Sequence, residues 1–439
     1  MAADTGPQQR RFGFLDHAAL WGSLGVSLYI MPFGSLLVPA LSVERAILAT
    51  AVAGFIGALI MATIAAMAAR TGQSTLELLA GVFGPRAPAP MALLLLVRNV
   101  ALGAFALVLV ADSAELVSER ALGAGLRPLW VVIFAALGLA LVKAGPDFVV
   151  RRLLKRGGFW LVLMVAAGIT ISAYMEFEVP AYLTRPAVGG WPSFWQAVDV
   201  MLIVPLLWLP LVADYARLGS NARSAAGGTF AGFFIATVWL GALGIVYLPA
   251  VESGDIAGFV VGMKLGMAAL VILLVLQLDE VFANMNSAVL ALGFFRRLDQ
   301  RAAALAVTLL AVAAALPLDL VSSEGYFLLI GSLFVPLFGV LIADQMMPGK
   351  GTTAAVPLAA WALGFAAYQW ISPADVGWWR DVMERVFADG LRLPFPLTDE
   401  VTWLGAAIPS FLVASAVQML GVRTAAAVRL WPRLATGSE

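Results

Sequence analysis

Long apolar segments recur along the whole of this 439-residue chain and limit the folds that it can adopt. A helix needs about 20 mostly apolar residues to cross a bilayer, and in lipid only helices and closed barrels satisfy every backbone hydrogen bond. About twelve windows qualify: 18–41, 46–69, 91–116, 128–142, 149–175, 194–215, 225–251, 265–294, 302–320, 326–346, 354–371 and 401–422. The fourth and ninth windows are short, so counts of eleven or thirteen also stay open. We therefore predict an all-α polytopic membrane protein.

Composition narrows the classes of function. The formal net charge is zero, which gives no reason to expect nucleic acid as a partner, whereas membrane lipid must surround the apolar spans. The chain contains no cysteine and one histidine, which excludes disulfides, thiol nucleophiles and cysteine-ligated metals. No nucleophile–base pair or set of metal ligands emerges, so we expect neither an enzyme nor a resident cofactor.

Lysine and arginine are distributed unevenly between alternate loops. The N-terminal segment, the even-numbered loops and the C-terminal tail hold 18 of the 27 basic residues, and the odd-numbered loops hold 8. Cytoplasmic loops are enriched in Lys and Arg. The pattern predicts an even number of spans with both termini in the cytoplasm, in the inner (plasma) membrane of a cell. We interpret the cluster of Arg151, Arg152, Lys155 and Arg156 as part of this orientation signal.

Two predicted spans contain helix-breaking residues. The sixth span carries Pro205 and Pro210 with Trp208 between them, and the first combines glycines and serines with Pro32. Each proline removes a backbone donor and disfavours helical geometry in the preceding residue. We predict non-helical backbone near 28–32 and 205–210. Matched breaks in two halves of a chain point to an inverted-repeat transporter, and the alternative is two unrelated kinks in packing helices.

The eighth span carries a polar stripe. Its members are three or four residues apart and so share one helical face: Gln277, Glu280, Asn284 and Ser287. Asp279 lies beside the stripe. Carboxylates inside a span are costly, so they should face a cavity or a partner. The stripe could coordinate a cation, carry a proton or bind a polar substrate, and the alternative is a buried structural pairing.

Polar residues in the third span give weaker signals. Arg98 and Asn99 lie within the span, and we expect Arg98 to extend its side chain to the cytoplasmic interface. Asp112 and Glu115 lie near the outer end, where we expect them to meet water.

Two segments resemble the signatures of a known transporter family, nucleobase–cation symporter family 1, in its cytosine and hydroxymethylpyrimidine permease branch. Residues 205–217 read PLLWLPLVADYAR and resemble the sixth-helix signature, while residues 329–344 read LIGSLFVPLFGVLIAD and resemble the tenth. Looser likenesses extend over essentially the whole chain: Leu20-Trp21-Gly22, Gly72, Phe83-Gly84 and Asn286-Ser287-Ala288.

The resemblance implies a five-plus-five inverted repeat, LeuT-like in architecture, with two additional C-terminal helices. Residues 18–175 and 194–346 would form the two repeats of a transporter core spanning 18–346. Residues 347–422 would hold the additional helices and a loop, and 1–17 and 423–439 would be cytoplasmic tails.

The resemblance also implies the function and the site. The protein would import a planar nitrogen heterocycle, such as cytosine, hydroxymethylpyrimidine or a related nucleobase, by alternating access coupled to H⁺ or Na⁺. Trp208 would stack on the heterocycle and Asn284 would bond its edge. The remaining expected substrate-binding residues are Phe105, Gly103, Asn99 and Tyr29, and the expected ion-coupling residues are Asp279, Glu280, Leu28 and Met31.

Two departures from the family pattern leave alternatives open. Ala104 stands where the family has an aromatic residue in the third helix. Asp279 and Glu280 stand where it has a Ser/Thr pair that often helps to bind sodium. Adjacent carboxylates in a low-dielectric span repel each other, which favours a protonated form and hence proton coupling over sodium. No metal other than such a sodium ion is expected.

Other functions stay open as well. The nearest rival is an amino-acid permease of the same architecture, and a rival of another class is a membrane receptor that binds ligand without transporting it. The sequence does not define an oligomeric state, and a monomer is compatible with every reading.

Overall fold

The computed structural model describes eleven stretches of the chain. They are residues 11–26, 30–176, 183–184, 186–247, 274, 277–295, 299–318, 320–347, 354–374, 376–396 and 405–435. Helices make up nearly all of this part, and the β-structure within it is one isolated bridge between Phe12 and Gly219. The predicted all-α fold class is therefore confirmed.

The chain divides into two compact units, residues 1–75 with 92–323 and residues 76–91 with 324–439. The first holds α1 (Phe14–Gly25), α2 (Ile30–Ser35), α3 (Val43–Thr71), α6 (Arg127–Asp147), the π-helix η2 (Phe148–Gly158), α7 (Phe159–Glu176), α9 (Phe194–Ala216), α10 (Ala222–Tyr247), α13 (Leu278–Phe295) and α14 (Gln300–Ala315). The second holds α16 (Ala355–Ile371), α17 (Gly377–Glu384), the π-helix η4 (Arg385–Gly390) and α18 (Ala407–Ala435). The division falls within α4 (Thr75–Phe83), α5 (Pro88–Leu122) and α15 (Leu320–Met346).

Seven helices of the described part are long and apolar enough to cross a membrane, or eight if the bent pair of α13 and α14 forms one span. The longest run extends from Arg127 to Ser172 and contains α6, η2 and most of α7, with a kink at Gly145, whose backbone is not helical. Every window predicted from the sequence overlaps at least one described helix, but the windows 128–142 and 149–175 fall in the one run from Arg127 to Ser172, so the count of about twelve spans stays a prediction.

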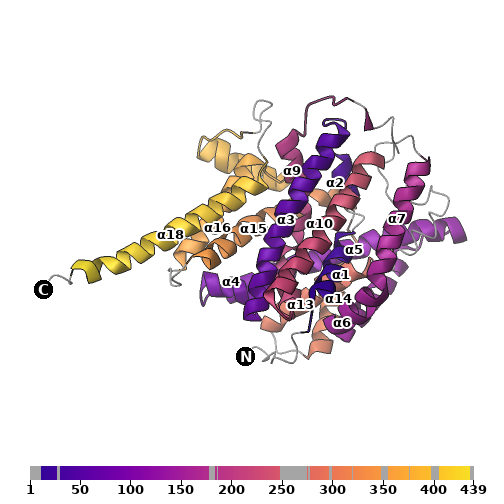
Figure 1. Cartoon of the computed structure of the whole chain (residues 1–439), viewed down its shortest axis with the longest axis horizontal. Helices are drawn as coiled ribbons and strands as arrows, with labels where there is room; N and C mark the ends of the chain where they lie inside the picture. Colours follow the sequence, from indigo (N-terminus) through magenta and orange to yellow (C-terminus); the bar gives the residue numbers. More distant parts are fainter. Residues whose placement is uncertain are drawn as a thin grey trace. The chain divides into compact units, whose positions relative to one another are not determined.

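In the first unit, α10 packs along α1, α2 and α3, and α3 also packs against α9 (Figure 1). Glycines, which have no side chain, make these close approaches possible. A Cβ at Gly244 of α10 would overlap the backbone of Met31 in α2, and a Cβ at Gly57 of α3 would overlap the ring of Pro205 in α9. Small residues at such crossings are typical of helix packing in membranes.

The two predicted helix breaks have different outcomes. α1 ends at Gly25 and α2 starts at Ile30, so the first span is divided, although Pro32 lies inside α2 and residues 27–29 lie outside the described part. The predicted break at 205–210 is wrong, because α9 continues as one helix through Pro205 and Pro210. A proline inside a membrane helix is tolerated where neighbouring groups satisfy the freed backbone. Pro210 removes the donor to the carbonyl of Leu206, and Arg98 donates to the next carbonyl along, that of Leu207.

In the second unit, side-chain hydrogen bonds to backbone and carboxylate groups tie α18 to α15 and α16. Ser410 donates to the carbonyl of Gly364 at 2.8 Å, and Gln418 donates from its side-chain nitrogen to Asp344 at 3.0 Å. The indole of Trp361 donates to the carbonyl of Leu333 at 2.8 Å. Buried donors are therefore paired with acceptors on adjacent helices, as lipid requires.

Candidate functional site

A buried arginine joins three helices in the first unit. Arg98 of α5 is 2% exposed, and its Nη1 donates to Oδ1 of Asn99 at 2.6 Å and to Oδ1 of Asn284 in α13 at 3.0 Å. Its Nη2 donates to the backbone carbonyl of Leu207 in α9. We call these four residues the Arg98 cluster. A guanidinium can hold several acceptors in one plane, so this side chain fixes α5, α9 and α13 at a single point.

The cluster also orients two amide side chains. Both Asn99 and Asn284 turn their oxygens toward Arg98. The amide nitrogen of Asn284 donates to the carbonyl of Glu280 at 3.0 Å. An amide whose oxygen is held in this way must direct its NH₂ group elsewhere. Asn99 and Asn284 are 1% and 2% exposed, so the arrangement lies well inside the protein.

The expectation that Arg98 reaches the cytoplasmic interface is wrong. Its side chain is buried and bonded on three sides, since polar acceptors within α5, α9 and α13 replace the water that it would otherwise seek. The sequence held a signal for this outcome. Asn99 directly follows Arg98, and the predicted span continues for many apolar residues on its far side.

The structure describes three of the other predicted substrate residues, which lie on the same helices as the Arg98 cluster. Trp208 directly follows Leu207 in α9 and is 8% exposed. Gly103 is one helical turn after Asn99, and the space where its Cβ would stand is 3.6 Å from Cβ of Asn284. Phe105 is buried farther along α5, seven residues after Arg98 and on the same helical face. Tyr29 lies outside the described residues.

A second polar group lies where α13 meets the last turn of α1. Asp279 is 4% exposed, and neither of its carboxylate oxygens receives a geometrically good hydrogen bond among the described residues. The hydroxyl of Ser23 in α1 lies beside this carboxylate. The C-terminal end of a helix carries partial negative charge. A carboxylate next to such an end favours either a bound cation or a proton.

The other expected ion-coupling residues are placed less directly. Glu280 is 5% exposed and follows Asp279 in the first described turn of α13. Met31 is buried in α2, with its backbone against Gly244 of α10. Leu28 lies outside the described residues. In the described part of the chain, no group of three or more His, Cys, Asp or Glu side chains could hold a metal ion.

The Asp-Tyr pair that ends α9 makes structural contacts. The backbone N–H of Thr75 donates to Oδ1 of Asp214 at 3.0 Å, and the hydroxyl of Tyr215 donates to the carbonyl of Ala283 in α13 at 3.0 Å. Both side chains are buried. This part of the signature therefore holds α9 against α13 and against the start of α4.

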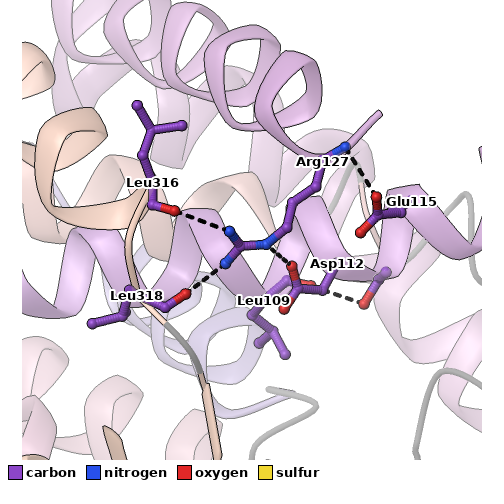
Figure 2. Close-up of polar contacts among 7 residues, drawn as sticks. Leu109, Asp112, Glu115, Arg127, Leu316 and Leu318 are labelled. Carbon is purple, nitrogen blue, oxygen red and sulfur yellow. Dashed lines mark hydrogen bonds and ion pairs between the residues drawn. The ribbon is translucent and has the colours of Figure 1, made fainter. Parts of the chain in front are cut away.

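A second arginine cluster lies elsewhere in the first unit (Figure 2). Nε of Arg127, in α6, is 2.5 Å from Oδ1 of Asp112 in α5, and the backbone N–H of Arg127 donates to Glu115 at 3.2 Å. Its two Nη atoms donate to the carbonyls of Leu316 and Leu318, at 3.2 and 2.6 Å, just after α14. We call these five residues the Arg127 cluster. Asp112 and Glu115, which we expected to meet water, are half-buried and bonded.

Comparison with known proteins gives the fold. No protein-family model and no curated protein sequence matches this chain. Among solved structures, Mhp1, a nucleobase-cation-symport-1 family transporter in a closed conformation with bromovinylhydantoin bound, is 16% identical, with a TM-score of 0.73 over 97% of this chain and 95% of that one. MhsT in complex with L-phenylalanine is 14% identical, with a TM-score of 0.58 over 91% of this chain and 98% of that one.

A Na⁺-coupled sialic acid symporter, in a substrate-bound outward-open state, matches as well. It is 16% identical, with a TM-score of 0.52 over 94% of this chain and 98% of that one. The structural matches establish a common fold. At identities this low, the function of this chain has to be argued from its own residues. The chain has the fold that these transporters share, which confirms the LeuT-like class predicted from the sequence.

Proposed function

We propose that this protein is a secondary active transporter of the nucleobase–cation symport type, which imports a small planar nitrogen heterocycle together with a cation. The observation that carries the proposal is the Arg98 cluster. It contains a buried guanidinium and two oriented amides from three helices, and Trp208 follows Leu207 of this cluster in the sequence. Polar groups of this kind inside a membrane protein mark substrate or ion pathways. The fold shared with Mhp1 and with two other transporters supports the same reading.

The orientation of the amides favours a substrate with a hydrogen-bond acceptor on its edge, such as a ring nitrogen or a carbonyl oxygen. Because Asn99 points its oxygen at Arg98, its NH₂ group is left to donate to a ligand. The indole face of Trp208 would stack on the ring, as aromatic side chains do on nucleobases. Cytosine, uracil, hydroxymethylpyrimidine and hydantoin all combine a flat ring with polar edge groups. Asn284 and the space beside Gly103 would complete the site, with Phe105 and Tyr29 as further lining.

The expected mechanism is alternating access, in which one helix bundle rocks against the rest around a fixed site. Asp279 beside the last turn of α1 supplies the coupling site in this proposal. A bound Na⁺, or a proton on the carboxyl group, would neutralise the charge of Asp279. Glu280, Leu28 and Met31 are proposed as neighbours of that site. We also propose an inner (plasma) membrane location with both termini in the cytoplasm, from the loop charges.

A ligand panel tests the substrate. Thermal unfolding of the purified protein is measured with cytosine, uracil, hydroxymethylpyrimidine, hydantoin and L-phenylalanine, because a ligand stabilises the state that it binds. At one hundred times its dissociation constant, a ligand adds about 2.7 kcal/mol, which is readily measured. We expect at least one heterocycle to stabilise the protein and the amino acid not to. Stabilisation by L-phenylalanine alone would favour the amino-acid permease instead.

Substitution of Asp279 tests how uptake is coupled to an ion gradient. In proteoliposomes, we expect Asp279→Asn to abolish accumulation driven by the ion gradient while exchange of substrate across the membrane continues. An imposed pH gradient in sodium-free buffer, compared with a sodium gradient at fixed pH, identifies the ion. Glu280→Gln is tested in parallel, since Glu280 is adjacent, equally buried and proposed as a neighbour of the same site. Unchanged coupling in both variants would remove this pair from the mechanism.

A further inference from the structure

The segment after α6 gathers its basic side chains on one face. Gly145, with φ at 83°, and Pro146 bend the chain, and the π-helix η2 follows. In a π-helix the backbone bonds i→i+5, so residues four and five apart lie over one another. This geometry aligns the four basic residues of η2: Arg151, Arg152, Lys155 and Arg156. The opposite face buries Val149, Val150 and Leu154.

These side chains line a cavity together with a residue from the N-terminal segment. The cavity has a volume of about 470 Å³ and is lined by Arg11, Asp147, Arg151, Arg152, Lys155 and Arg156. The backbone of Arg11 is fixed in place, because its N–H donates to the carbonyl of Leu218 at 2.9 Å and the adjacent Phe12 forms the bridge to Gly219. Two segments far apart in the sequence therefore build one concave, cationic site.

Internal pairing leaves Arg152 and Arg156 of this lining without a carboxylate partner among the described residues. The lining has five cationic side chains and one carboxylate, Asp147, which is 3.4 Å from Arg151. Lys155 pairs with the buried carboxylate of Asp16 at 2.9 Å. Arg152 and Arg156 are exposed, and neither forms an ion pair among the described residues. An orientation signal needs only charge in a loop, whereas these side chains converge on one cavity.

We propose that this cavity binds a phosphate-bearing anion. The planar fork of arginine matches phosphate oxygens, and charge-assisted hydrogen bonds of this kind are roughly twice as strong as neutral ones. The volume lies within the range of small-ligand pockets. The phosphate can come from the headgroup of an anionic phospholipid or from a free phosphate compound in solution. The site is separate from the Arg98 cluster, so it does not depend on the proposed transport function.

Two binding measurements on the full-length protein separate the sources. In the first, delipidated protein in detergent is titrated with inorganic phosphate and pyrophosphate, and binding is followed by calorimetry. In the second, retention of phosphatidylglycerol and of phosphatidylcholine is compared by native mass spectrometry of protein from nanodiscs. The test variant is R152Q/R156Q, which removes two arginines from the cavity. In whichever measurement detects binding by wild type, we expect this variant to bind roughly ten- to thirty-fold more weakly.

The matched control is R70Q/R223Q, which removes the same charge from two exposed arginines outside the cavity. We expect this control to bind within about two-fold of wild type, and we expect 0.5 M salt to weaken wild-type binding. Binding in the lipid arm alone identifies a headgroup, and binding in the titration identifies a soluble phosphate compound. Equal losses in both double variants, or no specific binding by wild type in either arm, would overturn the proposal.

Discussion

Two arginine clusters in the first unit use the same chemistry in different settings. Arg98 and Arg127 each donate to backbone carbonyls near a proline, at Leu207 in α9 and at Leu316 and Leu318 after α14. Arg127 also has a carboxylate partner, Asp112, and its side chain is 24% exposed. Arg98 is 2% exposed, and its hydrogen bonds in the described structure go to neutral oxygens.

In our proposal this difference distinguishes a structural contact from a functional one. A half-exposed ion pair costs little to form and contributes little to stability, so it joins α5, α6 and α14 without needing another role. A buried guanidinium held by neutral acceptors is expensive, and such groups in membrane proteins are retained at functional sites. We therefore propose that the Arg127 cluster serves packing and that the Arg98 cluster serves substrate binding. The following variants test that assignment, from the largest expected effect to the smallest.

Replacing Arg98 should have the largest effect. Arg98→Lys keeps the charge, but an ammonium group cannot hold three acceptors in the geometry of the guanidinium fork. We expect uptake to fall at least about 100-fold, because a small displacement of binding groups costs that much. Arg127→Lys, assayed in the same proteoliposomes, should keep uptake within about three-fold. Equal losses in the two variants would show that the clusters do not differ in role.

Replacing Asn99 with aspartate would give the Arg98 cluster a carboxylate, as the Arg127 cluster has in Asp112. Asn99→Asp gives Arg98 a carboxylate partner and removes the NH₂ group proposed to face the substrate. We expect the thermal midpoint to stay the same or rise, while substrate affinity falls by roughly 30- to 100-fold. Calorimetry and thermal unfolding measure the two quantities separately. A variant that loses stability and affinity together would indicate a purely structural role for Asn99.

Trp208 tests whether a ligand site lies beside the cluster. Stacking of a base on an aromatic ring is worth about 1–3 kcal/mol, so Trp208→Ala should weaken substrate binding roughly ten- to hundred-fold. Trp208→Phe keeps an aromatic face and should retain part of the affinity. The measurement is ligand titration of variants shown to be folded by circular dichroism. Wild-type affinity in a folded Trp208→Ala protein would contradict the proposed site.

Removing the carboxylate from the Arg127 cluster should have the smallest effect. Asp112→Asn leaves Arg127 with its neutral acceptors and a half-exposed charge. We expect a loss of about 1 kcal/mol or less in the free energy of unfolding and no more than a two-fold change in uptake. Thermal unfolding and uptake assays measure these changes. A large loss of uptake would mean that this contact between α5, α6 and α14 takes part in transport.

The sequence predicted the fold better than the site. Apolar length indicated a helical membrane protein because the bilayer imposes the length of a span directly. The glycines of the first span indicated its division, whereas the expectation of non-helical backbone at Pro32 is wrong, because Pro32 lies inside α2. The same reasoning failed for Pro205 and Pro210, since α9 continues through both, and it did not predict that Arg98 donates to the carbonyl of Leu207 in this helix. That contact joins residues 109 positions apart, so no local pattern could reveal it.

The polar stripe of the eighth span illustrates the same limit. Helical spacing correctly placed Asn284 on a buried polar face, but it did not identify the residue to which Asn284 is hydrogen-bonded. Its partner proved to be Arg98, which local reasoning had assigned to the interface. The proximity of Ser23 to Asp279 likewise depends on how α1 and α13 pack, which the sequence of either helix alone does not determine.

Gradient-driven accumulation tests the central claim most directly. Wild-type protein and the Asn99→Asp variant are reconstituted in proteoliposomes, and labelled cytosine, uracil, hydroxymethylpyrimidine and hydantoin are offered under a pH gradient or a sodium gradient. The account predicts that wild type concentrates at least one heterocycle above the external level, that collapsing the gradient with an ionophore releases it, and that the variant accumulates none. Saturable binding of a heterocycle without accumulation, or equal accumulation by both proteins, would contradict it.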